Sequence, residues 1–159
     1  VGAVAMACHG YVRATRDIDL ATELATFTQM RTLYNRCRDR GWSAELRLPD
    51  AEDPLGGVLD VEGDGFDLIQ VVNFYNPLRP TPNPGTDALD RAVALDTMPA
   101  LRVATVEDLI LLKLYAGGRK SELDVIELIE ATPSLQRSSL LDRARRFELE
   151  EVLSRLLRP

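Results

Sequence analysis

Two aspartates separated by one apolar residue, Asp17-Ile18-Asp19, are the feature of the sequence best suited to chemistry. The alternation predicts a strand, in which residues two apart project from one face about 6.6 Å apart, while Ile18 goes into the core. A third carboxylate, Asp67, belongs to a second predicted strand, Phe66–Val72. If the two strands are neighbours, three carboxylates converge on the oxygen-rich kind of site that Mg²⁺ prefers. Two such ions about 3.5 to 4 Å apart activate both oxygens of a phosphoryl transfer.

An isolated Asp-x-Asp pair has a simpler reading as solvated strand or turn residues. The residues around the pair instead favour a metal- and phosphate-binding site. Gly2 stands at the start of a predicted helix, where backbone N–H groups are free to hold phosphate oxygens. Arg13 and Thr15 lie four and two residues ahead of Asp17 and supply a cation and a hydroxyl at the start of the strand.

Lysine is rare in this chain. Of 19 basic residues 17 are arginine, and the two lysines, Lys113 and Lys120, fall in one short segment. Lys113 follows the apolar run 109–112 of a predicted helix, where a cation is costly unless an anion pairs with it. A lysine in an arginine-rich chain indicates a need for a compact point charge. The alternative is a lysine that snorkels from a core helix.

The elements that position these residues follow from periodicity and from Gly and Pro signals. Helices are predicted at 3–9, 22–40, 105–115 (capped by Thr105) and 121–131, with two more in 138–157 that break near residue 146. Strands are predicted at 17–20, 43–48, 57–61, 66–72, 92–95 and 101–104. Residues 76–86 contain four prolines and are predicted to be an exposed loop. The order predicts an α/β (α+β) fold with a mixed sheet flanked by helices and a helical C-terminal part.

Composition excludes several protein classes. The 159 residues are 45% apolar and 28% charged, which excludes a disordered chain, and no apolar run approaches the roughly 20 residues of a membrane-spanning helix. We therefore expect a cytoplasmic protein without a membrane partner. Cys8 and Cys37 lie in predicted helices without CxxC spacing and are expected to be buried, reduced thiols. The chain starts with Val1 rather than Met, so we expect the native chain to begin earlier.

The net charge of −6 disfavours indiscriminate binding of nucleic acid. Residues 48–100 carry the deficit, with two arginines against ten acidic residues. Residues 1–47 have seven arginines against five acidic residues, and residues 101–159 are balanced at ten against ten. A polyanionic partner is therefore expected to approach the ends of the sequence rather than its middle.

Two blocks of the sequence resemble the nucleotidyltransferase superfamily. The first block is Val1-Gly2-Ala3-Val4-Ala5 followed by His9-Gly10-Tyr11-Val12-Arg13-Ala14-Thr15-Arg16-Asp17-Ile18-Asp19-Leu20, which looks like the glycine turn, short helix and Asp-x-Asp of that group. Its Arg-x-Thr-x-Asp-Ile-Asp form is similar to minimal nucleotidyltransferases, including AbiEii-type toxins. The second block is Val103-Ala104-Thr105-Val106-Glu107-Asp108-Leu109-Ile110-Leu111-Leu112-Lys113-Leu114 with Gly118-Arg119-Lys120-Ser121 and Leu123-Asp124-Val125. Together they bracket residues 1–125.

The resemblance implies roles for individual residues. Asp17 and Asp19 would be the catalytic carboxylates that bind Mg²⁺ (or Mn²⁺), and Asp67 would be the third, acting as base or metal ligand near the acceptor hydroxyl. Lys113 would contact the nucleotide phosphates, and Asp124 would orient Lys113 or the substrate. Residues 1–104 would form the catalytic core, with the helical residues 105–159 packed on it.

The nucleotide-binding residues implied by the first block are Gly2, Ala3, Arg13 and Thr15. The family usually has Gly or Ser where this chain has Ala3. A side-chain hydroxyl is therefore missing at that position, and only backbone donors are available to a phosphate there.

The expected function is transfer of a nucleoside monophosphate from an NTP to an acceptor hydroxyl. The acceptor could be the 3′ end of a tRNA, as in toxin and antitoxin pairs with an antitoxin partner, or a protein side chain or an antibiotic. One alternative is a catalytically silent nucleotidyltransferase fold that serves as a binding module or nucleotide sensor, which Ala3 favours slightly. Another is a metal-dependent nuclease with the same carboxylates, which would not need the upstream glycine.

Overall fold

The computed structural model describes residues 1–95 and 98–158, and in this part of the chain it has seven helices, a four-stranded mixed sheet and a two-stranded antiparallel sheet. The helices are α1 (Gly2–Ala7), α2 (Phe27–Asp39), α3 (Pro84–Arg91), α4 (Val106–Ala116), α5 (Arg119–Ala131), α6 (Arg137–Arg145) and α7 (Glu150–Leu156). The strands are β1 (Asp17–Thr22), β2 (Ser43–Arg47), β3 (Val58–Gly63), β4 (Phe66–Asn73), β5 (Val93–Leu95) and β6 (Met98–Val103). The predicted α/β class and the helical C-terminal part are confirmed. No helix among the described residues is long and apolar enough to cross a membrane.

The chain divides into two compact units. The sheet unit comprises Gly2–Val4 and Ala14–Thr81, and the helical unit comprises Val1, Ala5–Arg13 and Pro82–Pro159. The division follows spatial contacts and does not run through residue 104. The boundary expected after residue 104, between a catalytic core and a helical part, therefore stays a prediction.

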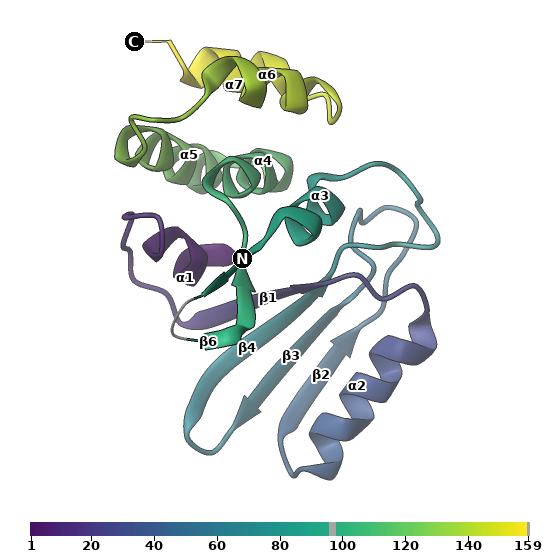
Figure 1. The fold of residues 1–159 in the computed structure, drawn as a ribbon. Coiled ribbons are helices and arrows are strands. Elements are labelled where there is room, and N and C mark those ends of the chain that lie inside the picture. The colour runs from purple at the N-terminus through teal and green to yellow at the C-terminus, as the bar shows by residue number, and fades with distance from the viewer. Residues whose placement is uncertain (96–97, 159) are drawn as a thin grey trace. The chain divides into compact units, whose positions relative to one another are not determined.

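The sheet unit is built on the strand order β1-β4-β3-β2 (Figure 1). β1 lies parallel to β4, with Asp17 opposite Leu68 and Asp19 opposite Gln70. The other two pairings are antiparallel. β1 is therefore an edge strand, and the Asp-x-Asp pair sits at the start of that edge.

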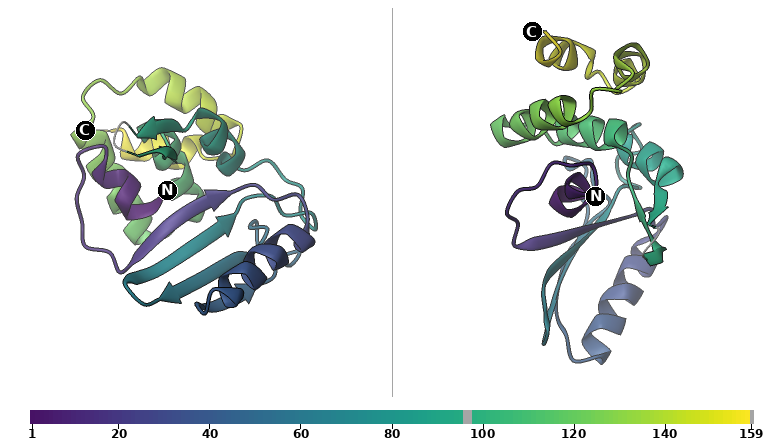
Figure 2. Two further views of the ribbon diagram at one scale, coloured as in Figure 1. Left: turned by 60° about the horizontal axis from the view of Figure 1, so that its bottom comes forward. Right: turned by 60° about the vertical axis from the view of Figure 1, so that its left-hand side comes forward.

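Helix α2 covers one side of the sheet along β2 and β3 (Figure 2). Its buried Met30 and Cys37 pack against Leu59 and Val61 of β3, whose alternation directs those two side chains to the same side. The sequence prediction of a helix over 22–40 begins too early. Thr22 still belongs to β1, and the helix starts at Phe27, directly after its N-cap Thr26, which forms a capping box with Gln29 in the first turn.

A buried asparagine ties the far end of the sheet to its loops. The Asn73 amide, 2% exposed, donates to the carbonyl of Leu24 at 3.0 Å and to that of Gly56 at 3.2 Å. Its Oδ1 accepts from the Leu24 N–H at 2.8 Å. Gly56 has no room for a side chain, because a Cβ there would lie 1.7 Å from the Tyr75 carbonyl oxygen.

Replacing Asn73 with alanine is therefore expected to lower the free energy of unfolding by about 3 kcal/mol, because several buried polar groups lose their partner at once. Urea unfolding of the two proteins measures the difference. The matched control is Asn35→Ala on the exposed part of α2, which should stay within about 0.5 kcal/mol of the wild type. Equal losses for both variants would contradict the role given to Asn73.

The helical unit confirms the predicted break after α4 and corrects two other predictions. Thr105 caps α4, and Gly117 follows it with φ 70°. The loop predicted at 76–86 instead ends in α3, because Asn83 accepts the Gly85 N–H and a proline stands in the first turn. Cys8 is exposed, since α1 already ends at Ala7, so the prediction of two buried thiols holds only for Cys37; neither cysteine forms a disulfide within the described part of the chain.

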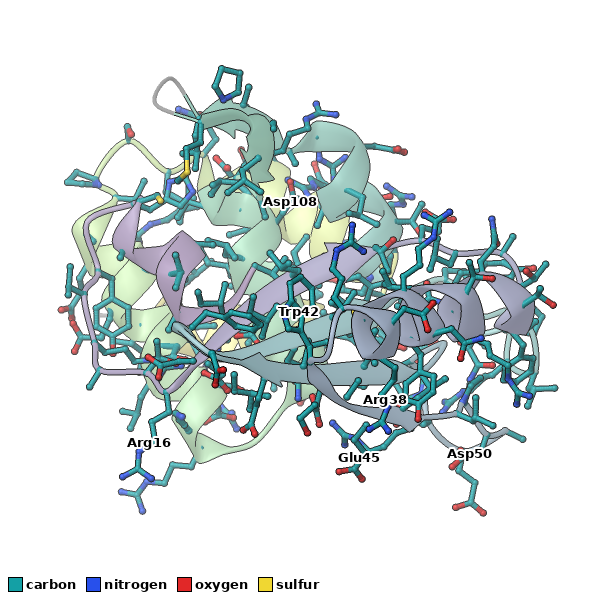
Figure 3. The ribbon with its side chains drawn as sticks, turned by 90° about the horizontal axis from the view of Figure 1, so that it is seen from below. Arg16, Arg38, Trp42, Glu45, Asp50 and Asp108 are labelled. Carbon is teal, nitrogen blue, oxygen red and sulfur yellow. The ribbon has the colours of Figure 1, made fainter. Side chains whose placement is uncertain are left out.

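An ion-pair network, here called the arginine network, lies in this unit. Its centre is Asp108 of α4, which is 0% exposed and accepts from the Thr105 hydroxyl at 2.7 Å (Figure 3). Arg91 lies 2.8 Å from Asp108 Oδ1, and Arg143 also contacts this oxygen. Arg91 and Arg146 further pair with Asp87 at 3.0 and 2.8 Å. The members are Asp87, Arg91, Asp108, Arg143 and Arg146.

The network predicts an acid-sensitive contribution to stability at Asp87. Partial burial opposes ionisation of Asp87, but hydrogen bonds and charges from Arg91 and Arg146 outweigh it and hold its pKa below the ordinary value. A depressed pKa contributes stability that is complete above the unfolded pKa of about 3.9 and is lost as the pH falls through the folded pKa. The stability difference between wild type and Asp87→Asn should be full at neutral pH and shrink below about pH 4, as urea unfolding across pH would show. Asp90→Asn, on the exposed side of α3, serves as the control; a difference for Asp87→Asn that did not change with pH would contradict the assignment.

Candidate functional site

Asp17 and Asp19 project from one face of β1, as their spacing predicts. Both side chains are half-buried, and the residues paired with them on β4, Leu68 and Gln70, share that face. Ile18 points to the other face, but it is 39% exposed rather than part of the core. The expectation for Ile18 is wrong because α2 packs on β2 and β3, leaving the edge strand uncovered within this unit.

The position of Asp67 depends on an irregularity in β4. Leu68 pairs with Asp17, so strict alternation would put Asp67 on the opposite side of the sheet from Asp17. The pairing of β4 with β3 shifts by one residue at this point, so Asp67 and Leu68 together stand opposite the single residue Glu62. Two residues against one is the pattern of a β-bulge, which interrupts alternation.

The neighbours of the bulge fix the side on which Asp67 lies. Ile69 pairs with the core residue Val61, and Phe66 packs against the same core and meets Trp42 edge to face at 5.3 Å. Phe66 and Ile69 therefore both face α2, and the two residues between them face away. Asp67 thus lies on the same side of the sheet as Asp17 and Asp19.

Two further carboxylates on this side were missed by sequence reasoning. Asp60 pairs with Gln70, which in turn pairs with Asp19, and Gln70 Nε2 donates to Asp60 Oδ1 at 2.8 Å. Glu62 follows two residues later in β3. The signal was present in β3, where both acidic residues alternate with core residues. We call the five residues Asp17, Asp19, Asp60, Glu62 and Asp67 the carboxylate face; Glu45 of β2 points to the same side (Figure 3).

Gly2 lies directly against the Asp19 carboxylate. A Cβ on Gly2 would be 1.8 Å from Asp19 Oδ2, and its φ of 69° is a conformation that side chains disfavour. Only glycine therefore permits this approach. Ala3 is buried, with 4% exposure.

A hollow of about 620 Å³ opens beside Asp67, lined by Thr15, Arg16, Glu62, Gly63, Phe66, Asp67 and Leu68. The Thr15 hydroxyl donates to the Asp17 carboxylate and so orients it. Arg16 is exposed and projects away from the sheet (Figure 3). The hollow thus combines two carboxylates, a hydroxyl and an exposed cation.

The lysine predicted to bind phosphate pairs with the aspartate predicted to orient it. In the helical unit, Lys113 Nζ lies 3.0 Å from Asp124 Oδ2, and the Asp124 side chain is 3% exposed. Arg13 Nε lies 3.1 Å from the other oxygen of the same carboxylate. We call Arg13, Lys113 and Asp124 the lysine cluster. Its two cations exceed its one carboxylate, which leaves a net positive charge.

The remaining predictions concern which side chains lie together in the structure. Arg13 and Thr15 were expected together at the start of β1, but the structure places their partners in different units: Asp124 for Arg13 and Asp17 for Thr15. His9, the single histidine, hydrogen-bonds the Ala104 carbonyl at 2.8 Å.

The carboxylates on β1 are suited to a hard divalent cation. Mg²⁺ usually keeps several waters and takes one or two protein carboxylates together with substrate phosphates. Asp17 and Asp19 supply two such groups on one face. Among the described residues no three His, Cys, Asp or Glu side chains gather around one point where a metal could sit. The donor set therefore fits a divalent cation held by two carboxylates.

Comparisons with known proteins assign no family to the chain. No protein-family model matches it, and no curated protein matches it either.

Proposed function

We propose that the protein is a metal-dependent nucleotidyltransferase that moves a nucleoside monophosphate from an NTP to an acceptor hydroxyl. The observation that carries the proposal is the placement of Asp17, Asp19 and Asp67 on one side of the sheet, which depends on the bulge in β4. The resemblance of the two sequence blocks to minimal nucleotidyltransferases supports it.

The chain's own residues would act mainly by positioning and charge. Mg²⁺ or Mn²⁺, when bound, neutralises phosphate charge and activates the attacking and leaving oxygens. Asp17, oriented by Thr15, and Asp19, held close to Gly2, provide the ligands. Asp67 stands where it can accept the proton of an acceptor hydroxyl that enters the adjoining hollow. The α-phosphorus is then attacked in line, and pyrophosphate leaves.

The lysine cluster would supply the positive charge that a triphosphate requires. Lys113 carries a compact ammonium, and the buried Asp124 restrains its position. We propose that Lys113 contacts the nucleotide phosphates.

The proposal also covers the class of molecule that accepts the nucleoside monophosphate. We put forward a tRNA 3′ end and a protein hydroxyl as the two acceptors, an antitoxin as a partner, and the cytoplasm, where NTPs are abundant, as the setting. The exposed Arg16 beside Asp67 supports an acceptor that carries phosphate.

A direct experiment is incubation of the protein with each α-labelled NTP, Mg²⁺ and either total tRNA or cell lysate. The proposal expects label on one class of macromolecule, lost when Mg²⁺ is chelated. Cleavage of labelled RNA without any NTP would instead support a nuclease with the same carboxylates.

One alternative is a catalytically silent binding module, which Ala3 favours because it supplies no side-chain hydroxyl for a phosphate. Such a module would be stabilised against heat by an NTP with Mg²⁺ and would transfer no label. Loss of that stabilisation in Asp19→Ala would place the bound nucleotide at the carboxylate face.

A further inference from the structure

Tyr11 contacts the lysine cluster, and nothing in the sequence singled it out. Arg13 Nε and Lys113 Nζ lie 3.1 and 3.0 Å from the two oxygens of the Asp124 carboxylate, and a hydrogen bond with this carboxylate is among the causes that raise the pKa of the Tyr11 phenol. Burial raises the pKa of Tyr11, and the charges of Asp124 and Glu127 raise it further, while Arg13 lowers it. The phenol is therefore protonated at neutral pH and acts as a donor to Asp124.

Charge balance alone does not require so many partners. One cation is enough to neutralise Asp124, yet Arg13, Lys113 and Tyr11 all interact with this carboxylate. Asp124 is also buried, with 2% exposure. A buried carboxylate with several donors loses its freedom to rotate, so each donor fixes the geometry of the others. The ammonium group of Lys113 has three N–H groups, and Asp124 forms an ion pair with it. The remaining N–H groups of Lys113 thus have a direction that Asp124 sets.

We propose that Tyr11 and Arg13 are positioning residues of the nucleotidyl transfer. They hold the Asp124 carboxylate in place and thereby fix where Lys113 presents its charge to the nucleotide phosphates. This inference rests on the proposed function. It also gives Arg13 a role different from the direct nucleotide contact expected from the sequence, because its guanidinium is engaged with Asp124.

The first test is steady-state kinetics of Tyr11→Phe, which removes one hydroxyl. The KM for the NTP is expected to rise about tenfold with kcat within about twofold, because binding common to ground and transition state is lost. Arg13→Gln should raise KM at least as much, and Arg13→Lys, which keeps the charge without the fork, should recover part of the loss. The matched control is Tyr115→Phe on α4, the helix that carries Lys113, which should leave KM unchanged.

A second test does not depend on activity. Inorganic tripolyphosphate is expected to raise the melting temperature of the wild type, to have no such effect on Lys113→Gln, and to have a reduced effect on Tyr11→Phe and Arg13→Gln. Melting without tripolyphosphate gives the folding baseline for each variant. If Tyr11→Phe does not fold, Arg13→Lys carries the same comparison.

The outcomes separate this inference from the proposed function. Wild-type KM values in both Tyr11→Phe and Arg13→Gln, in an active enzyme, would overturn the positioning role and leave the transferase standing. A wild type that transfers no label but gains stability from tripolyphosphate through Lys113 and Tyr11 would remove the transferase and keep the positioning role. No stabilisation of the wild type by tripolyphosphate would overturn the inference in either case.

Discussion

Replacing Asp19 with asparagine is expected to lower the rate of nucleotidyl transfer by about 10³-fold or more, equivalent to about 4 kcal/mol of transition-state stabilisation. Asparagine keeps the size of the side chain, so the close contact with Gly2 is preserved. What changes is the negative charge, which the divalent cation requires. Initial rates with the labelled NTP at saturating Mg²⁺ measure the loss.

The matched control for this variant is Asp39→Asn at the end of α2, an exposed aspartate of the same unit. It should retain the wild-type rate. Asp17→Asn should resemble Asp19→Asn, whereas a rate for Asp19→Asn within tenfold of wild type would remove the carboxylate face from the chemistry.

Replacing Asp108 with asparagine is expected to lower the free energy of unfolding by about 3 to 5 kcal/mol, because a buried ion pair loses one partner. Asp108 is 0% exposed, and both Arg91 and Arg143 depend on it. The hydrogen bond with Asp108 is also the largest cause of the raised pKa of Arg91. Asparagine leaves two cations facing a neutral amide.

Urea unfolding gives the magnitude, provided the dependence on urea concentration is unchanged. The control is Asp142→Asn, whose carboxylate pairs with Arg145 but is 69% exposed, so that the change should stay within about 1 kcal/mol. Equal effects at Asp108 and Asp142 would show that the arginine network adds nothing beyond a surface pair.

Local signals in the sequence predicted much of the fold. The alternation around Ile18 placed Asp17 and Asp19 on one face of a strand, and the Thr105 cap placed the start of α4. Both depend on interactions within a few residues. The start of α2 was predicted too early because Thr22 prefers its pairing with Asn73 on β4, a contact 51 positions away in sequence that no local pattern reports.

Long-range geometry decided the parts of the candidate site that sequence could not predict. Whether Asp67 joins Asp17 depends on one extra residue in the β4 bulge, and two-residue periodicity does not reveal a bulge. The convergence of Tyr11, Arg13 and Lys113 on Asp124 brings together segments about 100 positions apart in the sequence, since Arg13 and Asp124 are separated by 111. Burial of Asp124 turns this convergence into a fixed arrangement.

The central claim is that the carboxylate face supports transfer of a nucleoside monophosphate. The most direct measurement compares two labels on the same NTP, one in the α-phosphate and one in the γ-phosphate, after incubation with Mg²⁺ and the tRNA and protein pools. We expect the wild type to attach the α-label and never the γ-label, and Asp17→Asn and Asp19→Asn to attach neither. Attachment of the γ-label, or undiminished α-labelling by Asp19→Asn, would contradict it.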